Sequence, residues 1–273
     1  MNIGTSELHH LCKDIHTRYG YDFSHYAVPS FSRRVHKVLN LNNLQSVDEL
    51  HARVMGNPQF FYAVLNSLTV TVTDFYRDPA VWQRIRTDLV PHLRKYKSLT
   101  FWSAACSSGQ EAYSLAILLH ESGLLNRSTI YATDINYRAL EHAKKGEYSA
   151  NTIRAGQDNY ASSQGPFEFA KYFNQYGHDY TILPELRRRV IFKNQNLARE
   201  SSLGKMNLVF CRNAMIYFDK MLNNTVLTLL DESLVKDGFL IIGTKESLSQ
   251  TPISDNYTTL HCAERIFKKK PLA

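Results

Sequence analysis

The stretch Thr100–Leu119, TFWSAACSSGQEAYSLAILL, predicts a β-strand, a tight turn and a helix in direct succession. A β-prone run opens it, small side chains fill residues 103–109, and apolar residues then return at helical spacing. Small side chains let the backbone approach a ligand, and the N–H groups of a first helical turn point towards it. This order is typical of a nucleotide-type cofactor site, although Gly109 is the one glycine in the turn.

Strands and helices continue to alternate after this stretch, which predicts an α/β domain with a largely parallel, Rossmann-like sheet. The second strand, 128–135, carries Asp134 near its end. An acid at that position binds ribose hydroxyls in Rossmann-like folds, whereas a helix N-cap is the alternative role. The strand at 206–212 is followed by Asn213 and Tyr217, which we expect at the ligand-binding edge because ligands bind beyond the carboxyl ends of parallel strands.

The sequence before and after this strand–turn–helix stretch predicts a helical N-terminal domain, a linker and an α/β domain. Residues 1–68 carry the spacing of four helices, and 69–79 form a β-branched linker that ends at a proline. Residues 80–273 form the α/β domain, with a helix over 80–96 interrupted near Pro91. Within 147–193 we expect a polar stretch, a helix over 167–176 and a small antiparallel unit, before 190–192 return to the main sheet. A turn is expected at Asp237-Gly238.

Composition places the chain among ordinary globular proteins, with 44% hydrophobic and 21% charged residues in 273. We expect a cytoplasmic protein without membrane insertion, because no apolar run approaches about 20 residues and the polar N-terminus lacks a signal-peptide core. The four cysteines form no C-x-x-C pair. His9, Cys12 and His16 share helical spacing, but a fourth ligand is not apparent, so we expect no metal site.

Three stretches together resemble the chemotaxis-receptor methyltransferases (CheR type), which esterify receptor glutamates. They are WSAACSSGQEAYSLA at 102–116, ATDINYRALEHAKKGEYS at 132–149 and LVFCRNAMIYFDK at 208–220. The linker at 71–79, FSRRV at 31–35 and GFLIIGTKESL at 238–248 fit as well. The resemblance implies S-adenosylmethionine as cofactor and S-adenosylhomocysteine as product. It also implies methylation of glutamate side chains on a chemotaxis receptor or a related signalling protein.

The resemblance also implies which residues form the site. It places Tyr217 beside the transferred methyl group, and it makes Tyr217 and Arg77 the catalytic candidates. Arg77 would bond the methionyl carboxylate of the cofactor. A glutamate nucleophile is already ionised at neutral pH, with a pKa of about 4.3, so orientation and removal of water replace a general base. The cofactor-binding candidates are Thr71, Thr73, Arg77, Glu111, Asp134, Asn196, Leu197, Asn213 and Ala214.

The net charge of +7 predicts an anionic partner. Arg33 and Lys37 share a helix face with Arg34 adjacent, and we expect this stripe to dock the acidic helical domain of a receptor. Two other functions stay open. One is a nucleic-acid methyltransferase of the same fold, which is disfavoured because the stretch after the fourth strand lacks the prolines of a base-gripping tetrad. The other is a non-catalytic cofactor-binding regulatory module. We expect a monomer without a nucleic-acid partner, although the sequence leaves the oligomeric state open.

Overall fold

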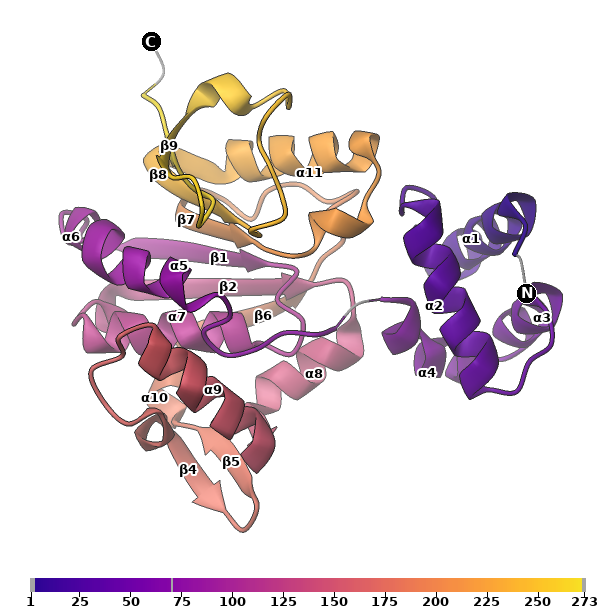
Figure 1. Ribbon diagram of the computed structural model, residues 1–273, viewed down its shortest axis with the longest axis horizontal. Coiled ribbons are helices and arrows are strands. Elements are labelled where there is room, and N and C mark those ends of the chain that lie inside the picture. The colour runs from indigo at the N-terminus through magenta and orange to yellow at the C-terminus, as the bar shows by residue number, and fades with distance from the viewer. Residues whose placement is uncertain (1–2, 70, 272–273) are drawn as a thin grey trace. The chain divides into compact units, whose positions relative to one another are not determined.

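The computed structural model describes residues 3–69 and 71–271, which form two compact units (Figure 1). The first unit contains the N-terminal helices together with Ala214–Thr225. The second unit contains Thr71–Asn213 and the chain from Val226 onward. The helical unit is thus assembled from two stretches that lie far apart in the sequence.

Four helices build the N-terminal part of the first unit, as the sequence predicts. Ser46 and Asn57 cap two of them with side-chain oxygens that accept the N–H groups of Glu49 and Phe60. The apolar face of each helix is buried in a common core. The four helices are α1 (Thr5–Tyr19), α2 (Val28–Leu41), α3 (Val47–Gly56) and α4 (Pro58–Leu68).

The segment from residue 214 joins this helical unit through backbone bonds. Tyr26 and Phe218 form an antiparallel bridge, and the N–H of Ala27 donates to the carbonyl of Tyr217 at 2.9 Å. Asp219 pairs with His25 twice, because its N–H donates to the His25 carbonyl at 2.8 Å and its carboxylate lies 2.9 Å from His25 Nδ1. These bonds make the segment an integral part of the helical unit.

The second unit is built around a seven-stranded sheet of order β6-β2-β1-β7-β8-β10-β9. The first five strands in this order are parallel, and β10 runs antiparallel to both of its neighbours. The order reverses between β1 and β7, and ligands of such sheets bind outside the carboxyl ends at this point. The strands are β1 (Leu99–Ala104), β2 (Ser128–Asp134), β6 (Val190–Asn194), β7 (Met206–Cys211), β8 (Leu234–Ile242), β9 (Tyr257–His261) and β10 (Ile266–Lys269).

Helices pack against this sheet, and α7 and α8 contact β2 and β6 (Figure 1). Every residue of α7 from Ala112 to Leu119 is buried, which explains why this segment is apolar all round. The predicted interruption near Pro91 is confirmed as a π-helical turn between α5 and α6. No helix in the described part of the chain has the length and apolarity of a membrane span. After α4, the helices of at least four residues in the described chain are α5 (Pro79–Arg84), the π-turn η1 (Ile85–Leu89), α6 (Val90–Leu93), α7 (Gln110–Glu121), α8 (Tyr137–Lys145), α9 (Ala150–Ser162), the 3₁₀ turn η3 (Phe169–Tyr172), α10 (Pro184–Arg187) and α11 (Lys220–Ser233).

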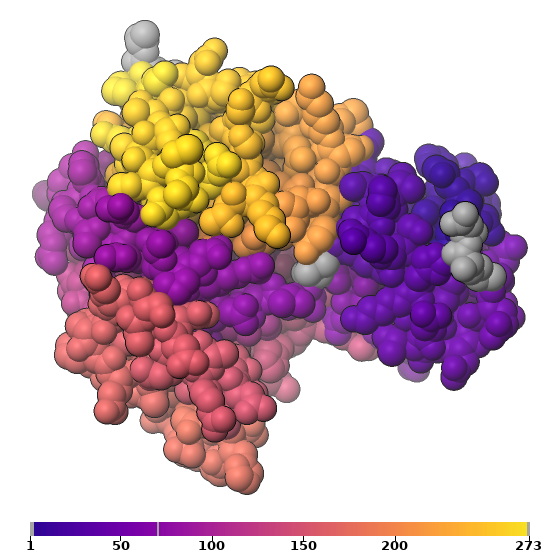
Figure 2. Space-filling view, in the orientation of Figure 1, coloured from indigo at the N-terminus to yellow at the C-terminus, as the bar shows by residue number. Residues whose placement is uncertain are grey.

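A second, three-stranded antiparallel sheet of order β3-β5-β4 lies within residues 147–182. Its strands are β3 (Glu147–Ser149), β4 (Phe173–Tyr176) and β5 (Asp179–Ile182), and the β4–β5 hairpin projects from the second unit (Figure 2). The predicted antiparallel unit is therefore confirmed, as is the return of residues 190–192 to the main sheet.

Two local predictions are wrong. The helix expected over 167–176 is the short turn η3 followed by β4. The polar stretch after residue 150, for which no element is predicted, is the helix α9. Residues Asp237-Gly238 lie inside β8 rather than in a turn between elements. Asp237 has a φ of 60° there and the pairing register with β7 shifts, so the turn signal in the sequence marks a strand irregularity.

Candidate active site

The turn that follows β1 alternates between ordinary and left-handed backbone. Ala105, Ser107 and Gly109 have φ values of 58°, 52° and 87°. A Cβ atom at Gly109 would lie 2.9 Å from the Cβ of Ala143, so that position requires glycine. The left-handed conformation costs a residue with a Cβ about 1–2 kcal/mol, which Ala105 and Ser107 bear. The turn thus follows the path of a glycine-rich cofactor loop with a single glycine.

Asp134 ties this turn to the end of β2. One carboxylate oxygen accepts the N–H of Ser107 at 2.7 Å, and the other accepts the N–H of Asn136 at 2.8 Å. Burial raises the pKa of Asp134, and these backbone donors act against that rise. The N-cap of α8 is Asn136, whose side chain accepts the N–H of Ala139, so the alternative role for Asp134 is wrong. Asp134 is therefore a buried acid at the carboxyl edge of the sheet.

The same turn is also bonded to the linker. The hydroxyl of Ser107 donates to the carbonyl of Thr71 at 2.7 Å. Thr73 and Arg77 are half-buried further along this segment. The guanidinium of Arg77 makes one hydrogen bond among the described residues, to the carbonyl of Val72 at a long 3.5 Å. That group is consequently available to an anionic ligand.

Arg212, which the sequence patterns do not single out, anchors the linker from the end of β7. Its side chain is 2% exposed and donates to Asp78 at 2.6 Å, to the Arg77 carbonyl at 3.0 Å and to Glu111 at 3.3 Å. Ser103 donates to the other oxygen of Glu111 at 2.8 Å. Burial raises the pKa of Glu111, while the Arg212 charge acts in the opposite direction. A cation directly after the buried strand 206–211 was the available signal, because a buried cation needs partners.

Two further loops complete this edge. After β6, Gln195 donates its N–H to the carbonyl of Asp134 at 3.1 Å, and the side chain of Asn196 accepts the N–H of Ala198. Leu197 is half-buried in this loop. After β7, Asn213 has a φ of 60° and donates its N–H to the buried carboxylate of Glu246. Contacts at the carboxyl ends of adjacent strands therefore bring together Thr71, Glu111, Asp134 and the loops that carry Asn196 and Asn213.

Ala214 and Tyr217 belong to the helical unit instead. The guanidinium of Arg34 stacks over the Tyr217 ring, 4.2 Å from its centroid. Arg34 also donates to the carbonyl of Leu68 at 3.0 Å and to the hydroxyl of Ser30 at 3.3 Å. Arg34 is only 8% exposed, so its predicted place in a docking stripe is wrong. Arg33 and Lys37 are exposed on α2.

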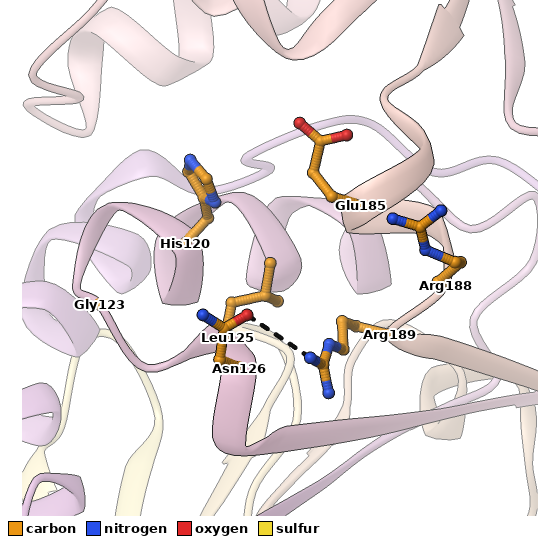
Figure 3. Close-up of a pocket in the computed structure, with 7 residues that line it drawn as sticks. All are labelled: His120, Gly123, Leu125, Asn126, Glu185, Arg188 and Arg189. Atoms are coloured by element: carbon orange, nitrogen blue, oxygen red, sulfur yellow. Dashed lines mark hydrogen bonds between the residues drawn. The ribbon is translucent and has the colours of Figure 1, made fainter.

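A pocket of about 300 Å³ lies at the opposite edge of the sheet (Figure 3). Its lining comes from the end of α7, the loop before β2 and the segment before β6, which are the amino ends of these strands. Arg189 donates to Asn126 across it at 3.5 Å. Ligands of doubly wound sheets bind at the carboxyl ends, so this pocket is not the cofactor site.

The carboxyl edge defines the class of protein. A glycine-like turn, a buried acid at the end of the second strand and an available guanidinium fit a cofactor with a ribose and an amino-acid carboxylate. Such a site on a sheet of this order is that of a Rossmann-like, cofactor-dependent enzyme.

Comparison with known proteins identifies the family. The description "CheR methyltransferase, SAM binding domain" matches residues 71–263, and "CheR methyltransferase, all-alpha domain" matches residues 6–69. The chain belongs to the CheR methyltransferase family, whose cofactor is S-adenosylmethionine.

Relatives cover nearly the whole chain. Cher3 of Pseudomonas putida is 40% identical over 263 residues, which are 96% of each chain. The chemotaxis protein methyltransferase Cher2 of the same organism is 30% identical, covering 86% of this chain and 87% of its own. Chemotaxis protein methyltransferase 1 of Pseudomonas aeruginosa is 32% identical with the same coverage.

Proposed function

We propose that this protein methylates glutamate side chains on an acidic, helical signalling protein of the chemotaxis-receptor type. The observation that carries the proposal is the half-buried Arg77, whose carbonyl is held by Arg212 and whose guanidinium makes a single long hydrogen bond among the described residues, at the edge where Asp134 lies. Relatives named chemotaxis protein methyltransferases support the substrate class. The net charge of +7 suits an acidic partner.

Each candidate has a defined task towards the cofactor. Arg77 would hold the methionyl carboxylate, because a guanidinium forms charge-assisted bonds with that group. Asp134 would hold ribose hydroxyls, since a carboxylate has about four acceptor sites and the backbone N–H groups of Ser107, Ile135 and Asn136 use three of them. Thr71, Thr73, Glu111, Asn196, Leu197, Asn213 and Ala214 complete the proposed binding set.

The chemistry requires little beyond positioning. When bound, S-adenosylmethionine supplies a sulfonium methyl group that an ionised carboxylate accepts without prior deprotonation. The protein must therefore orient the glutamate and exclude water from it. We assign the orientation to the Tyr217 hydroxyl. Arg34 is the residue that fixes the Tyr217 ring, because its own position is set by Leu68 and Ser30.

Labelled methyl transfer tests the proposal. The protein is incubated with methyl-labelled S-adenosylmethionine and the cytoplasmic fragment of a chemotaxis receptor from its host. We expect label on the receptor that mild alkali releases as methanol, because methyl esters hydrolyse and methylated amines do not. Alkali-stable label, or label on nucleic acid alone, would contradict the glutamate assignment.

Site variants separate binding from transfer. Asp134→Asn should weaken cofactor binding by about 1–3 kcal/mol, because a buried polar partner is lost. Tyr217→Phe should leave cofactor affinity near wild type and lower the transfer rate. Glu185→Gln, in the pocket at the opposite edge of the sheet, is the matched control and should change neither quantity. Full turnover in Tyr217→Phe would remove the hydroxyl from the mechanism.

A further inference from the structure

Three side chains of the types that bind transition metals converge on the surface of the helical unit. His10 and Asp14 lie one turn apart on α1, and His51 lies on α3. His51 Nε2 is 2.8 Å from Asp14 Oδ2, and His10 Nε2 is 3.5 Å from the same oxygen. One ligand atom from each residue lies within 4.8 Å of the others. This convergence joins residues separated by more than 35 positions, so sequence spacing does not reveal it.

The two helices hold the three side chains in place. Leu11 and Ile15 of α1 are fully buried, as are Leu50 and Val54 of α3, in the same apolar core. The backbone positions of the cluster are therefore fixed by packing rather than by the polar contacts. A site on two rigid helices loses little conformational entropy when it binds an ion.

Two of the three ligand–ligand distances are close to those of a zinc-type site. Metal–ligand bonds of about 2.0–2.2 Å place the ligands of a tetrahedral site about 3.3–3.6 Å apart. The His10–Asp14 distance of 3.5 Å already lies in this range. The His51–Asp14 pair, at 2.8 Å, would separate by about 0.5 Å, which a small side-chain rotation supplies. Two imidazoles and a carboxylate are a donor set that suits zinc and its neighbours.

The charge and the access of the cluster also suit a cation. Asp14 supplies a negative charge, because an aspartate carboxylate is ionised at neutral pH. The side chains of Asp14 and His51 are 32% and 24% exposed, while that of His10 is 68% exposed. An ion can enter from solvent, and water can fill the fourth position.

We infer that His10, Asp14 and His51 form a binding site for a divalent transition-metal ion such as Zn²⁺, which bridges α1 and α3. The site differs from the trio considered on α1 alone, His9, Cys12 and His16. Cys12 is buried in the apolar core of the helical unit, whereas His9 is exposed on the surface of the same helix.

Metal titration of the untagged, chelator-treated full chain tests the inference, with Co²⁺ as the optical probe and Zn²⁺ as the competitor. We expect one Co²⁺ per chain with visible d–d bands, and displacement by Zn²⁺. Zn²⁺ should also raise the unfolding temperature, because it binds the native helix pair and not the unfolded chain.

Variants decide whether these three residues are the ligands. His51→Ala, His10→Ala and Asp14→Asn should each weaken Zn²⁺ binding by about tenfold or more and abolish the rise in unfolding temperature. His9→Ala, next to His10 and exposed on the same helix, is the matched control and should bind as wild type. Equal losses in His9→Ala and His51→Ala, or no stoichiometric binding in the wild type, would overturn the inference. Circular dichroism of each variant separates a lost ligand from a lost fold.

Discussion

Ala105 occupies a left-handed backbone conformation that glycine adopts without strain. We expect Ala105→Gly to raise the free energy of unfolding by about 0.5–1 kcal/mol, because the relief of strain exceeds the entropy that glycine loses on folding. Urea unfolding measures the change. The neighbouring Ala104→Gly is the control, because Ala104 is a buried strand residue with ordinary φ. That variant should be destabilised, and a loss of stability in both would show that Ala105 is not strained.

Single residues also show what the sequence could and could not predict. Asp134 was predictable because its position depends on local order, at the end of a strand that follows a cofactor-type turn. Arg34 was not, because its burial depends on Leu68 and Tyr217, which lie far away in the chain. Helical spacing places Arg33 and Lys37 on one face but does not tell which neighbour turns inward. Whether a charged side chain is buried or exposed thus depends on residues that are distant in the sequence.

At the scale of elements, Glu121 connects its own helix, α7, to three others, η1, α9 and η3. This carboxylate at the end of α7 is 1% exposed and accepts from Arg86 of η1 at 2.6 Å. It also accepts from the hydroxyls of Tyr160 on α9 and Tyr172 on η3. We expect Glu121→Gln to lower the free energy of unfolding by about 3–5 kcal/mol, because it leaves the buried Arg86 charge uncompensated.

An exposed ion pair provides the control for the Glu121→Gln measurement. Glu141 bonds Lys144 at 2.8 Å, with both side chains nearly half exposed. Glu141→Gln should change the free energy of unfolding by less than about 1 kcal/mol. If Glu121→Gln were equally mild, the three elements would not depend on this carboxylate.

The same cluster predicts how stability depends on pH. Burial and the hydrogen bond to Glu121 raise the pKa of Tyr160 from 10.0 to about 12, and they raise the pKa of Tyr172 as well. Above pH 10 the unfolded chain therefore ionises these hydroxyls before the folded protein does. The stabilising contribution of Tyr160 is complete below pH 10 and is lost as the pH rises through about 12, and Tyr172 acts in the same direction. Urea unfolding across this range, with tyrosinate absorbance, measures it, and a flat profile would contradict it.

Elements were predictable where one face is uniformly apolar, and less so where a small residue lies in the core. In α9 the buried positions are Ile153, Gly156 and Tyr160, at helical spacing. Gly156 packs against Phe169, and a Cβ there would lie 2.7 Å from the Phe169 ring, so this position has no room for a side chain. Because glycine is not counted as apolar, the helical spacing of the buried positions is not recognised in the sequence. Glycine is also common in turns, so its presence here favours a loop over a helix. The close packing of α9 on η3 therefore could not be predicted from the sequence.

For the whole molecule, the charge of +7 predicts that recognition of an acidic partner weakens with salt. Arg33→Glu combined with Lys37→Glu should raise the KM for the receptor substrate, most strongly at low ionic strength, and leave cofactor affinity unchanged. Lys13→Glu combined with Arg18→Glu makes the same charge change on α1 and is the control. A normal KM for the α2 variant at low salt, or an equal rise in the control, would place the docking surface elsewhere.

The assembly of the helical unit from two stretches has a consequence for how such proteins can recombine. A single crossover near residue 70 would join the helices of one parent to residues 214–225 of the other. The chimaera would then have to match foreign partners at the Tyr26–Phe218 bridge, the His25–Asp219 pair and the Arg34–Tyr217 stack. Exchange of the helical unit between family members therefore needs three coordinated junctions, near residues 70, 213 and 225, and these three pairs should be inherited together.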